Sequence, residues 1–450
     1  MKKYAQIVAD MEQKIASGHY RAGRRVPSVR EAADLYGVSR GTIVKAYTEL
    51  EMRHAIYSIP QSGYYVVDQA GVGTRGAEIG LIDFSSSSPD SALFPHQDFR
   101  HCLNKAFELY SHHLFTYGDS AVTDNLRRTL VSHLADSQVF TKAERIILTA
   151  GIHHALGILA LMPFPNGHAE ILVEQPSYNL FLRFLEAERM PVSWIRRTSG
   201  GIDLDELEAK FRSGRIKFFY TMSRFHNPLG TTLSGEEREA VAKLAGKYDV
   251  FVVEDDYMAD LGEVKGFEPI CAHDRTSHVV YLKSFSKIIF PGLRLGAAVL
   301  PEPLVGAFSR YSRLTETSVL SQAALDIYIK NGMYARHRRG MYRQYADRNQ
   351  RLHEALRKHD AGRWIEAPPA ATGLYTHFRL PRTVNLERLV RRLAERNVAV
   401  TSGKPYYLAA CRDRDKFLRI SVSRADPMRI EEGVRIIVDE VAKSAVQRGT

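Results

Sequence analysis

The sequence predicts a multidomain α/β protein, and three observations support that prediction. The chain has 450 residues, a length that suggests roughly three domains. From residue 82 onward, short β-branched and apolar runs alternate with amphipathic helical stretches, a pattern typical of a mostly parallel sheet with helices on both faces. Residues 1–69 instead show helical periodicity followed by a short hairpin, and a glycine-containing segment separates the two parts.

The composition is that of a globular protein, with 44% hydrophobic and 25% charged residues. No apolar run reaches the roughly 18 residues of a membrane span, and the N-terminus lacks the apolar centre of a signal peptide. Three scattered cysteines form neither a disulfide framework nor a metal-binding spacing. We therefore expect a cytoplasmic protein without a metal site. The net charge of +11 favours a polyanionic partner.

Residues 1–69 are expected to begin with two helices. Apolar side chains recur every three or four residues up to Gly18, which is typical of a helix with one buried face. A shorter helix is expected over residues 29–36, because Ser28 is a favourable N-cap and Gly37 a favourable end.

A third helix is expected over residues 40–51, with Ser39 as its cap. We expect it to turn four side chains inward: Ile43, Val44, Tyr47 and Leu50. Two helices joined by so tight a turn are typical of a helix-turn-helix, whose later helix enters the major groove of DNA. Residues 57–67, with Gly63 at their centre, predict a hairpin. Periodicity alone fits a simple three-helix bundle equally well.

The literal string GHYRAGRRVPSVREAADLYGVSRGTIVKAY shifts that balance, because it resembles the GntR winged-helix domain over nearly its whole length. The resemblance implies that this domain binds double-stranded operator DNA. It assigns phosphate or base contacts and the wing tip to five residues: Arg30, Ser39, Arg40, Thr42 and Gly63.

The two parts of the chain are separated by the string DQAGVGTRGAEIG, which has four glycines and no apolar period. Such a composition is typical of a flexible connection. We place the linker at residues 70–81, and expect the two modules to adopt more than one relative orientation.

The stretch YLKSFSKIIFPGLRLG carries the chemistry of the larger part. It places Lys287 behind Ser284 and Ser286, and Arg294 follows a Pro-Gly turn. An amine can form an imine with an aldehyde, and hydroxyls beside a guanidinium suit a phosphate. Pyridoxal 5′-phosphate is an aldehyde that carries a phosphate. The stretch resembles the cofactor-lysine motif of fold-type I aminotransferases, and the resemblance implies that Lys287 is the catalytic and cofactor-bearing residue.

Three acids and a tyrosine follow the strand expected at residues 250–253. Burying a carboxylate there requires a compensating cation, and a protonated pyridine nitrogen is such a cation. By resemblance Asp255 pairs with that nitrogen and Tyr257 with the cofactor's phenolic oxygen, while Asp256 is the neighbouring candidate for the nitrogen. A solvated acidic turn is the alternative that the motif alone would favour.

Further cofactor contacts follow other strands. Gly151 opens a helix after one strand, and the backbone amides at such a helix start bind phosphate, here at Ile152 and His153. By resemblance Tyr178 stacks on the pyridine ring and Asn227 donates to its oxygen. Taken locally, Tyr178 fits a core tyrosine and Asn227 a simple turn.

Two residues complete the expected site. By resemblance Tyr117 reaches across a dimer to the neighbouring phosphate. Arg419, within the strand-like residues 416–422, would grip an effector carboxylate through two hydrogen bonds. A basic edge strand fits the local sequence of Arg419 equally well. Residues 423–450 predict a final helix.

A GntR-type domain fused to an aminotransferase-like domain is the architecture of the MocR family of bacterial regulators, and this chain resembles both halves in that order. Residues 82–450 form the second half, with a smaller α+β subdomain from about residue 320. The resemblance implies a homodimer that senses an amino acid, an amine or pyridoxal phosphate. The rival interpretation is an active aminotransferase with an appended DNA-binding head. A cofactor-free regulator is disfavoured because no key position is lost.

Overall fold

The structure is a computed structural model, and it describes residues 3–53, 55–59, 61–67, 80–116, 120–262, 264, 266–313, 315–369 and 373–446. The chain divides into two compact units, Met1–Gly80 and Leu81–Thr450. Most of the predicted linker, residues 70–79, lies outside the described residues. Each unit is therefore considered by itself.

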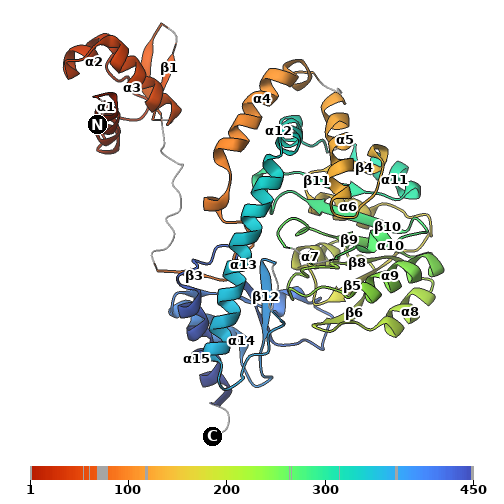
Figure 1. The fold of residues 1–450 in the computed structure, drawn as a ribbon. Helices are drawn as coiled ribbons and strands as arrows, with labels where there is room; N and C mark the ends of the chain where they lie inside the picture. Colours follow the sequence, from red (N-terminus) through yellow and green to blue (C-terminus); the bar gives the residue numbers. More distant parts are fainter. Residues whose placement is uncertain are drawn as a thin grey trace. The chain divides into compact units, whose positions relative to one another are not determined.

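The first unit is a three-helix domain with a hairpin (Figure 1). Its helices are α1 (Lys3–Ala16), α2 (Val29–Tyr36) and α3 (Arg40–Met52), followed by the antiparallel strands β1 (Ile56–Ile59) and β2 (Gly63–Val66). These elements confirm the predicted helices and the hairpin. Gly63, however, begins β2 and pairs with Ile59, so the turn precedes it.

The caps explain where α2 begins and ends. Ser28 Oγ accepts from the Glu31 amide at 3.2 Å, and Glu31 Oε2 accepts from the Ser28 amide at 2.7 Å, which together form a capping box. Gly37 ends the helix with φ of +58°, a left-handed conformation that glycine adopts without strain. Both features agree with the predicted bounds.

The inward face of α3 differs from the prediction at one position. Val44 is 46% exposed, so its predicted burial is wrong, and Ala46 is buried in its place. The buried stripe therefore runs through Ile43, Ala46, Tyr47 and Leu50. These positions follow the three-and-four spacing of one helix face, whereas Val44 lies about 100° around the helix from Ile43.

The second unit is built on an eight-stranded sheet in the order β4-β11-β10-β9-β8-β5-β6-β7. Strands β10, β9, β8, β5 and β6 run parallel, while β11 and β7 are antiparallel to their neighbours. The mostly parallel sheet is thus confirmed. The strands are β4 (Ile146–Thr149), β5 (Glu170–Gln175), β6 (Val192–Thr198), β7 (Gly201–Ile202), β8 (Ile216–Thr221), β9 (Phe251–Asp255), β10 (Val279–Ser284) and β11 (Gly296–Val299).

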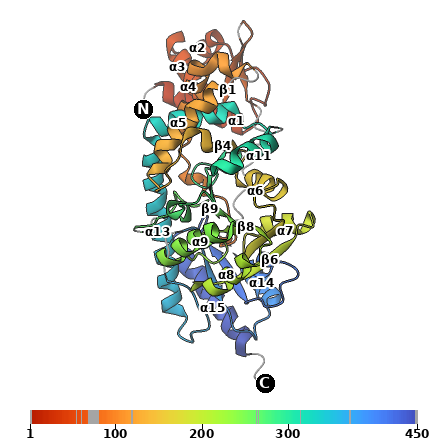
Figure 2. The ribbon, with the colours of Figure 1, turned by 90° about the vertical axis from the view of Figure 1, so that its right-hand side faces the viewer.

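Helices cover both faces of this sheet. Successive side chains of each strand point to opposite faces, and the helices bury both sets. Leu172 and Phe219 pack in one cluster with α8 (Leu204–Arg212) and α9 (Gly235–Tyr248), which lie in front of the sheet in Figure 2. Their strand neighbours Ile171 and Phe218 pack in a larger cluster with side chains of α6 and α7. The remaining helices of the large part are α4 (His96–Leu114), α5 (Ala121–Ala135), α6 (Ile152–Leu161), α7 (Asn179–Ala187), α10 (Ile270–His273), α11 (Glu302–Ser312) and α12 (Val319–Lys330), with 3₁₀ turns at Ser91–Leu93, Ala143–Arg145 and Pro291–Leu293.

The long helix α13 (Met333–His359) runs from the large sheet into a smaller subdomain (Figure 1). That subdomain has an antiparallel sheet in the order β12-β15-β14, and a separate parallel pair, β13 with β3. Its elements are β3 (Ile82–Asp83), β12 (Tyr375–Arg379), α14 (Leu386–Glu395), β13 (Val398–Ala399), β14 (Thr401–Ser402), a 3₁₀ turn at Lys404–Tyr406, β15 (Phe417–Ser421) and α15 (Ile430–Val446). The predicted start of the final helix at residue 423 is wrong, because residues 423–429 are not helical and α15 begins only at Ile430. Pro427 lies in this segment, and proline does not continue a helix from its preceding residues.

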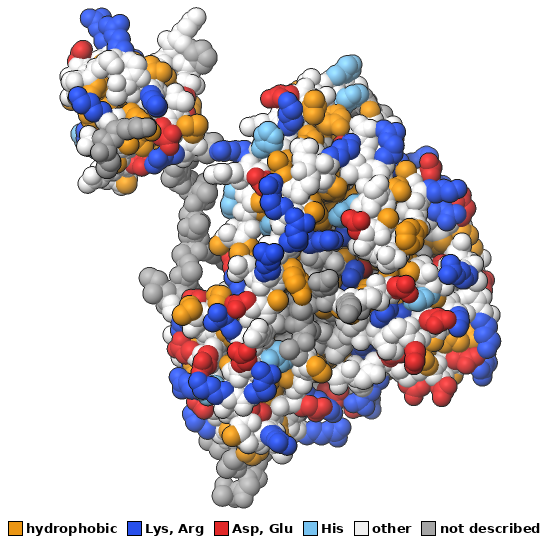
Figure 3. Space-filling view, in the orientation of Figure 1, with side chains coloured by type: hydrophobic (Ala, Val, Ile, Leu, Met, Phe, Trp, Pro, Cys, Tyr) orange, Lys and Arg blue, Asp and Glu red, His pale blue; other side chains and the backbone are white. Residues whose placement is uncertain are grey.

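The surface of the smaller subdomain mixes charges of both signs (Figure 3). Ion pairs join its helices, as between Lys358 and Glu431 at 2.6 Å and between Arg396 and Glu440 at 3.2 Å. Across the described part of the chain, no helix combines the length and apolar character needed to cross a membrane.

Candidate active site and nucleic-acid interface

A cavity of about 460 Å³ lies at the carboxyl ends of the parallel strands, where open α/β sheets bind ligands. The smaller subdomain contributes to its wall through Tyr375, Thr401, Tyr406 and Arg419. Every predicted cofactor or effector residue that the structure describes lines this cavity: Ile152, His153, Tyr178, Asn227, Asp255, Tyr257, Ser284, Ser286, Lys287, Arg294 and Arg419. Tyr117 lies outside the described residues.

One end of the cavity is suited to an anion. Gly151, with φ of +93°, precedes α6 and directs the first amides of that helix toward the cavity. Arg294 lies against it and donates to the Ala150 carbonyl at 2.6 Å. A Cβ on Gly151 would lie 3.1 Å from Arg294 Nη2, so glycine leaves room for the guanidinium. Ser284 and Ser286 line the same end.

Asp255 lines the cavity, and the Tyr257 backbone amide donates to its carboxyl. The Oδ2 of that carboxyl accepts from the Tyr220 hydroxyl at 2.9 Å, and its Oδ1 is buried. Burial raises the pKa of Asp255 to about 7, and the charge of Asp256 adds to this effect. A cation bound beside this carboxyl would lower its pKa again and favour its ionised form.

Asp256 is already paired elsewhere. Its two oxygens accept from Arg224 Nε and Nη2, each at 2.6 Å, and Oδ2 also accepts from the Tyr281 hydroxyl at 2.7 Å. Glu254 accepts from the Ile270 amide at 2.9 Å. All three acids are buried, so the solvated acidic turn is wrong. Of the three, only Asp255 lines the cavity.

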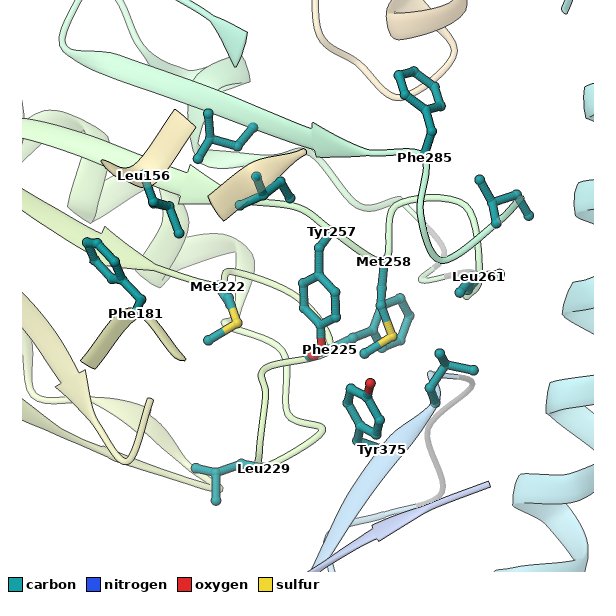
Figure 4. Packing of buried hydrophobic residues seen from close by; sticks show 14 of the residues in the cluster. Leu156, Phe181, Met222, Phe225, Leu229, Tyr257, Met258, Leu261, Phe285 and Tyr375 are labelled. Atoms are coloured by element: carbon teal, nitrogen blue, oxygen red, sulfur yellow. Dashed lines mark hydrogen bonds between the residues drawn. The ribbon is translucent and has the colours of Figure 1, made fainter. Parts of the chain in front are cut away.

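Lys287 is half-buried at the centre of the lining. Its Nζ donates to the carbonyl of Ser87 and lies 3.4 Å from the Tyr375 hydroxyl. Burial alone would raise the pKa of Tyr375, but the charges of Lys287 and Arg419 outweigh it, and the pKa is lowered. Figure 4 shows Tyr375 projecting from β12 toward Tyr257.

Tyr178 and His153 form one wall of the cavity. The Tyr178 hydroxyl and His153 Nε2 are hydrogen-bonded, and their ring centroids are 5.4 Å apart. Burial lowers the pKa of His153, with Arg294 and Lys287 adding to the effect, so a neutral imidazole is favoured. Tyr178 is half-buried at the cavity, not enclosed in the core.

The predicted ring-oxygen partners also reach the cavity. The Tyr257 hydroxyl donates to the Phe225 carbonyl at 2.9 Å, which leaves its oxygen free to accept. Asn227 is buried, and its Oδ1 lacks a partner among the described residues. Because Oδ1 only accepts, the predicted contact with the ring oxygen would instead use the amide NH₂ group of Asn227.

Arg419 lies on β15, the central strand of its sheet, so the edge-strand alternative is wrong. It is only 3% exposed. Nη1 donates to Ser87 Oγ at 3.0 Å and Nη2 donates to the Ser85 carbonyl. The guanidinium also lies 4.6 Å from the centre of the Tyr375 ring.

Sequence reasoning missed several residues of this site, among them Tyr220, Ser87, Tyr375 and Tyr406. The run of four serines at residues 85–88 was a visible signal, because so polar a run directly after a strand is unusual. The three tyrosines had no local signal. They reach the site only through the packing of strands that are far apart in sequence.

In the first unit the predicted DNA-binding side chains lie around the start of α3. Arg30 and Arg40 are exposed. Ser39 Oγ accepts from the Thr42 amide at 3.3 Å and lies 3.0 Å from Thr42 Oγ1, so this pair also caps the helix. Gly63 packs against Arg25, because a Cβ there would lie 2.9 Å from Arg25 Nε.

Comparison with known proteins finds a family match for each of the two units. Residues 80–437 match the family model of aminotransferase class I and II, and residues 3–66 match that of the bacterial regulatory proteins of the gntR family. The chain belongs to the MocR type of regulators. MocR-type proteins join these two domains in the same order as here.

Two curated relatives span most of this MocR-type chain. The uncharacterized HTH-type transcriptional regulator YcxD of Bacillus subtilis (strain 168) is 42% identical and covers 98% of this chain and 100% of its own. The probable rhizopine catabolism regulatory protein MocR of Rhizobium meliloti is 29% identical, covering 86% of this chain and 84% of its own.

A solved structure shares the fold of the second unit. The kynurenine aminotransferase of Pyrococcus horikoshii, solved in complex with PMP, has a TM-score of 0.73 and 24% sequence identity. The match covers 83% of this chain and 96% of that one.

Proposed function

We propose that this protein regulates transcription by binding operator DNA through its first unit and pyridoxal 5′-phosphate through its second. An amino acid, an amine or pyridoxal phosphate itself would be the signal. The observation that carries the proposal is the cavity that Lys287 and the carboxyl of Asp255 both line, in a chain that also bears a gntR-family domain.

The residues present fit this cofactor. Pyridoxal phosphate, when bound, supplies an aldehyde that reacts with amines and a ring that withdraws electrons. Asp255 would hold a proton at the pyridine nitrogen, since it alone of the three neighbouring acids lines the cavity. The amides at Ile152 and His153 would bind the phosphate with Ser284, Ser286 and Arg294.

The other lining residues would orient the ring and the signal. Asn227 and Tyr257 would contact the ring oxygen, and Tyr178 would stack on the ring. Lys287 would supply the reacting amine and Arg419 would pair with an effector carboxylate. A bound signal would order these groups and favour one arrangement of the DNA-binding first unit. A ligand that binds one conformation more tightly always increases the population of that conformation.

We further propose that the protein acts as a homodimer, in which Tyr117 of each chain would approach the other chain's phosphate. Operator DNA in a bacterium lies in the cytoplasm, so the proposal also places the protein there. On the operator, Arg30, Arg40, Ser39 and Thr42 would contact the DNA, and Gly63 would lie near the wing tip.

Replacing the lysine tests the cofactor site. The purified protein should be yellow and should shift a fragment of its own promoter, while Lys287→Ala should lose the visible band and still bind DNA. Lys243→Ala removes an exposed lysine on α9 and should change neither property. A wild-type preparation that stays colourless after soaking in pyridoxal phosphate would overturn the proposal.

A second experiment separates regulation from catalysis. The alternative function is an active aminotransferase, favoured by the presence of Lys287 and Arg419 in one cavity. An assay with amino donors and 2-oxoglutarate should be run beside a DNA-binding assay. Compounds that change both the visible absorption and the DNA affinity support sensing, whereas robust turnover without DNA binding supports the enzyme.

A further inference from the structure

A short segment of the second unit already occupies the groups that the proposed function assigns to the effector. This segment, the strap, comprises residues 82–88 with the sequence IDFSSSS. It directly follows the predicted linker.

The first part of the strap is fixed to the smaller subdomain. Strand β3 pairs with β13, and the Phe84 amide donates to the Ala399 carbonyl at 2.9 Å. Phe84 is fully buried, and its carbonyl accepts from the Ser421 amide at 2.8 Å. Displacement of the strap would thus begin after Phe84.

The polar half of the strap turns sharply toward the cavity. Asp83 Oδ1 accepts from the Ser85 amide at 2.8 Å and from the Ser86 amide at 3.0 Å. The Ser86 carbonyl accepts from Ser423 Oγ at 2.9 Å. Asp83 does not line the cavity, so it shapes the strap without touching a ligand there.

The end of the strap holds both effector-binding groups at once. Ser87 Oγ accepts from Arg419 Nη1 at 3.0 Å, and the Ser85 carbonyl accepts from Arg419 Nη2. The Ser87 carbonyl accepts from Lys287 Nζ and from the Tyr375 hydroxyl, the latter at 3.3 Å. One residue, Ser87, therefore touches the reacting amine and the carboxylate-gripping guanidinium.

We propose that the strap is an internal competitor of the effector carboxylate and that Ser87 is its principal positioning residue. Ser87 Oγ and the Ser85 carbonyl accept one N–H from each Nη of Arg419, and a carboxylate that binds on these two N–H groups must take their place. The carboxylate and the docked strap thus exclude one another. An amine that carries a carboxylate releases the strap. An amine without a carboxylate leaves the hydrogen bonds between Arg419 and the strap in place. This proposal rests on the proposed function of the cavity.

Amide hydrogen exchange of residues 82–88 tests the strap directly in the full-length, cofactor-loaded protein. Ser87→Ala should raise exchange at the Ser85 and Ser86 amides by at least about tenfold, the effect of losing one hydrogen bond to a charged group. Arg419→Ala should raise it further, and Asp83→Ala should raise exchange without altering the cavity. Ser86→Ala is the matched control, because its carbonyl still accepts from Ser423. Unchanged exchange in both Ser87→Ala and Arg419→Ala would overturn the proposal.

A matched pair of small molecules tests the competition. L-Alanine and ethylamine share an amino group and differ by the carboxylate. L-Alanine should raise exchange in the strap and bind at least about tenfold more tightly to Ser87→Ala than to the wild type, whereas ethylamine should do neither. Equal release by both molecules would contradict the proposal.

The two proposals fail in different ways. A protein without a visible band, or without DNA binding, contradicts the proposed function. The exchange comparison among the Ser87, Arg419 and Ser86 variants is measured without added ligand, so it decides the docking of the strap even when neither probe changes the absorption.

Discussion

The cavity of the second unit is proposed to bind its ligand through buried side chains, whereas the first unit is proposed to bind DNA through exposed ones. In the cavity, Asp255 is 2% exposed and its pKa is set by the groups packed around it. On the head, Arg30 and Arg40 are exposed, and their attraction to DNA would be screened by salt. Buried groups act strongly but require every neighbour in place, whereas exposed groups act weakly and depend little on one another.

The largest effect should come from breaking the buried pair beside the cavity. Arg224→Met leaves the buried carboxylate of Asp256 without its cation and should lower the free energy of unfolding by about 3–5 kcal/mol. Denaturant unfolding followed by circular dichroism measures the loss. Arg212→Met removes an exposed arginine and should cost less than about 0.5 kcal/mol. Equal losses would show that burial does not distinguish these two pairs.

In the cofactor-free protein, the pH dependence of the free energy of unfolding should reveal the titration of Asp255. Its folded pKa of about 7 exceeds its ordinary value of 3.8, so the stabilising effect of the bound proton is lost as the pH rises from about 4 to 7. Asp255→Asn lacks this loss. Its free energy of unfolding, relative to the wild type, should rise between pH 5 and 7 by at most about 1.4 kcal/mol per pH unit.

Asp347→Asn provides the control for that measurement, because Asp347 lies half-exposed on α13. A pH profile for Asp255→Asn that matches that of Asp347→Asn would mean that the carboxyl of Asp255 is ionised in the folded protein throughout this range.

A smaller effect is expected on the head. Arg40→Ala should weaken operator binding by about 1–3 kcal/mol if Arg40 contacts a base, and the loss should then vary with the sequence of the operator. If Arg40 contacts only phosphate, the loss should be uniform across sequences and the salt dependence should be shallower. Arg53→Ala, at the other end of α3 and paired with Glu49, should bind nearly as the wild type.

The smallest effect tests whether Ser39 serves the helix or the DNA. Ser39→Ala removes the cap of α3 and should lower the stability of the head by about 1 kcal/mol. Ser39→Asn keeps a capping oxygen and should restore most of that stability. A variant that folds as stably as the wild type but loses DNA binding would assign Ser39 to the DNA alone.

The sequence predicted the elements whose signals are local. Caps at Ser28 and Ser39 and the apolar strand expected at residues 250–253 were correctly interpreted, because each depends on neighbours within one helix turn or one strand. Val44 was misplaced because an apolar residue next to a buried stripe looks the same in sequence whether it lies on the stripe or beside it.

The candidate site was predictable where residues follow strand ends, and not where contacts cross between distant strands. The motif around Asp255 did not show which of two adjacent acids would face the cavity. That choice depends on Arg224 and Tyr281, which lie on other segments and pair with Asp256. In the same way, nothing near Tyr375 in sequence indicates its approach to Lys287, 88 positions earlier.

The pairing of β3 with β13 has a practical consequence for dividing the protein. A shortened chain that begins at Leu81 retains a strand whose partner lies more than three hundred positions later, together with Phe84 in the core. A version trimmed to begin at Ser91 would lose that strand and expose the apolar surface that Ile82 and Phe84 cover. The earlier boundary should yield the better-behaved isolated unit.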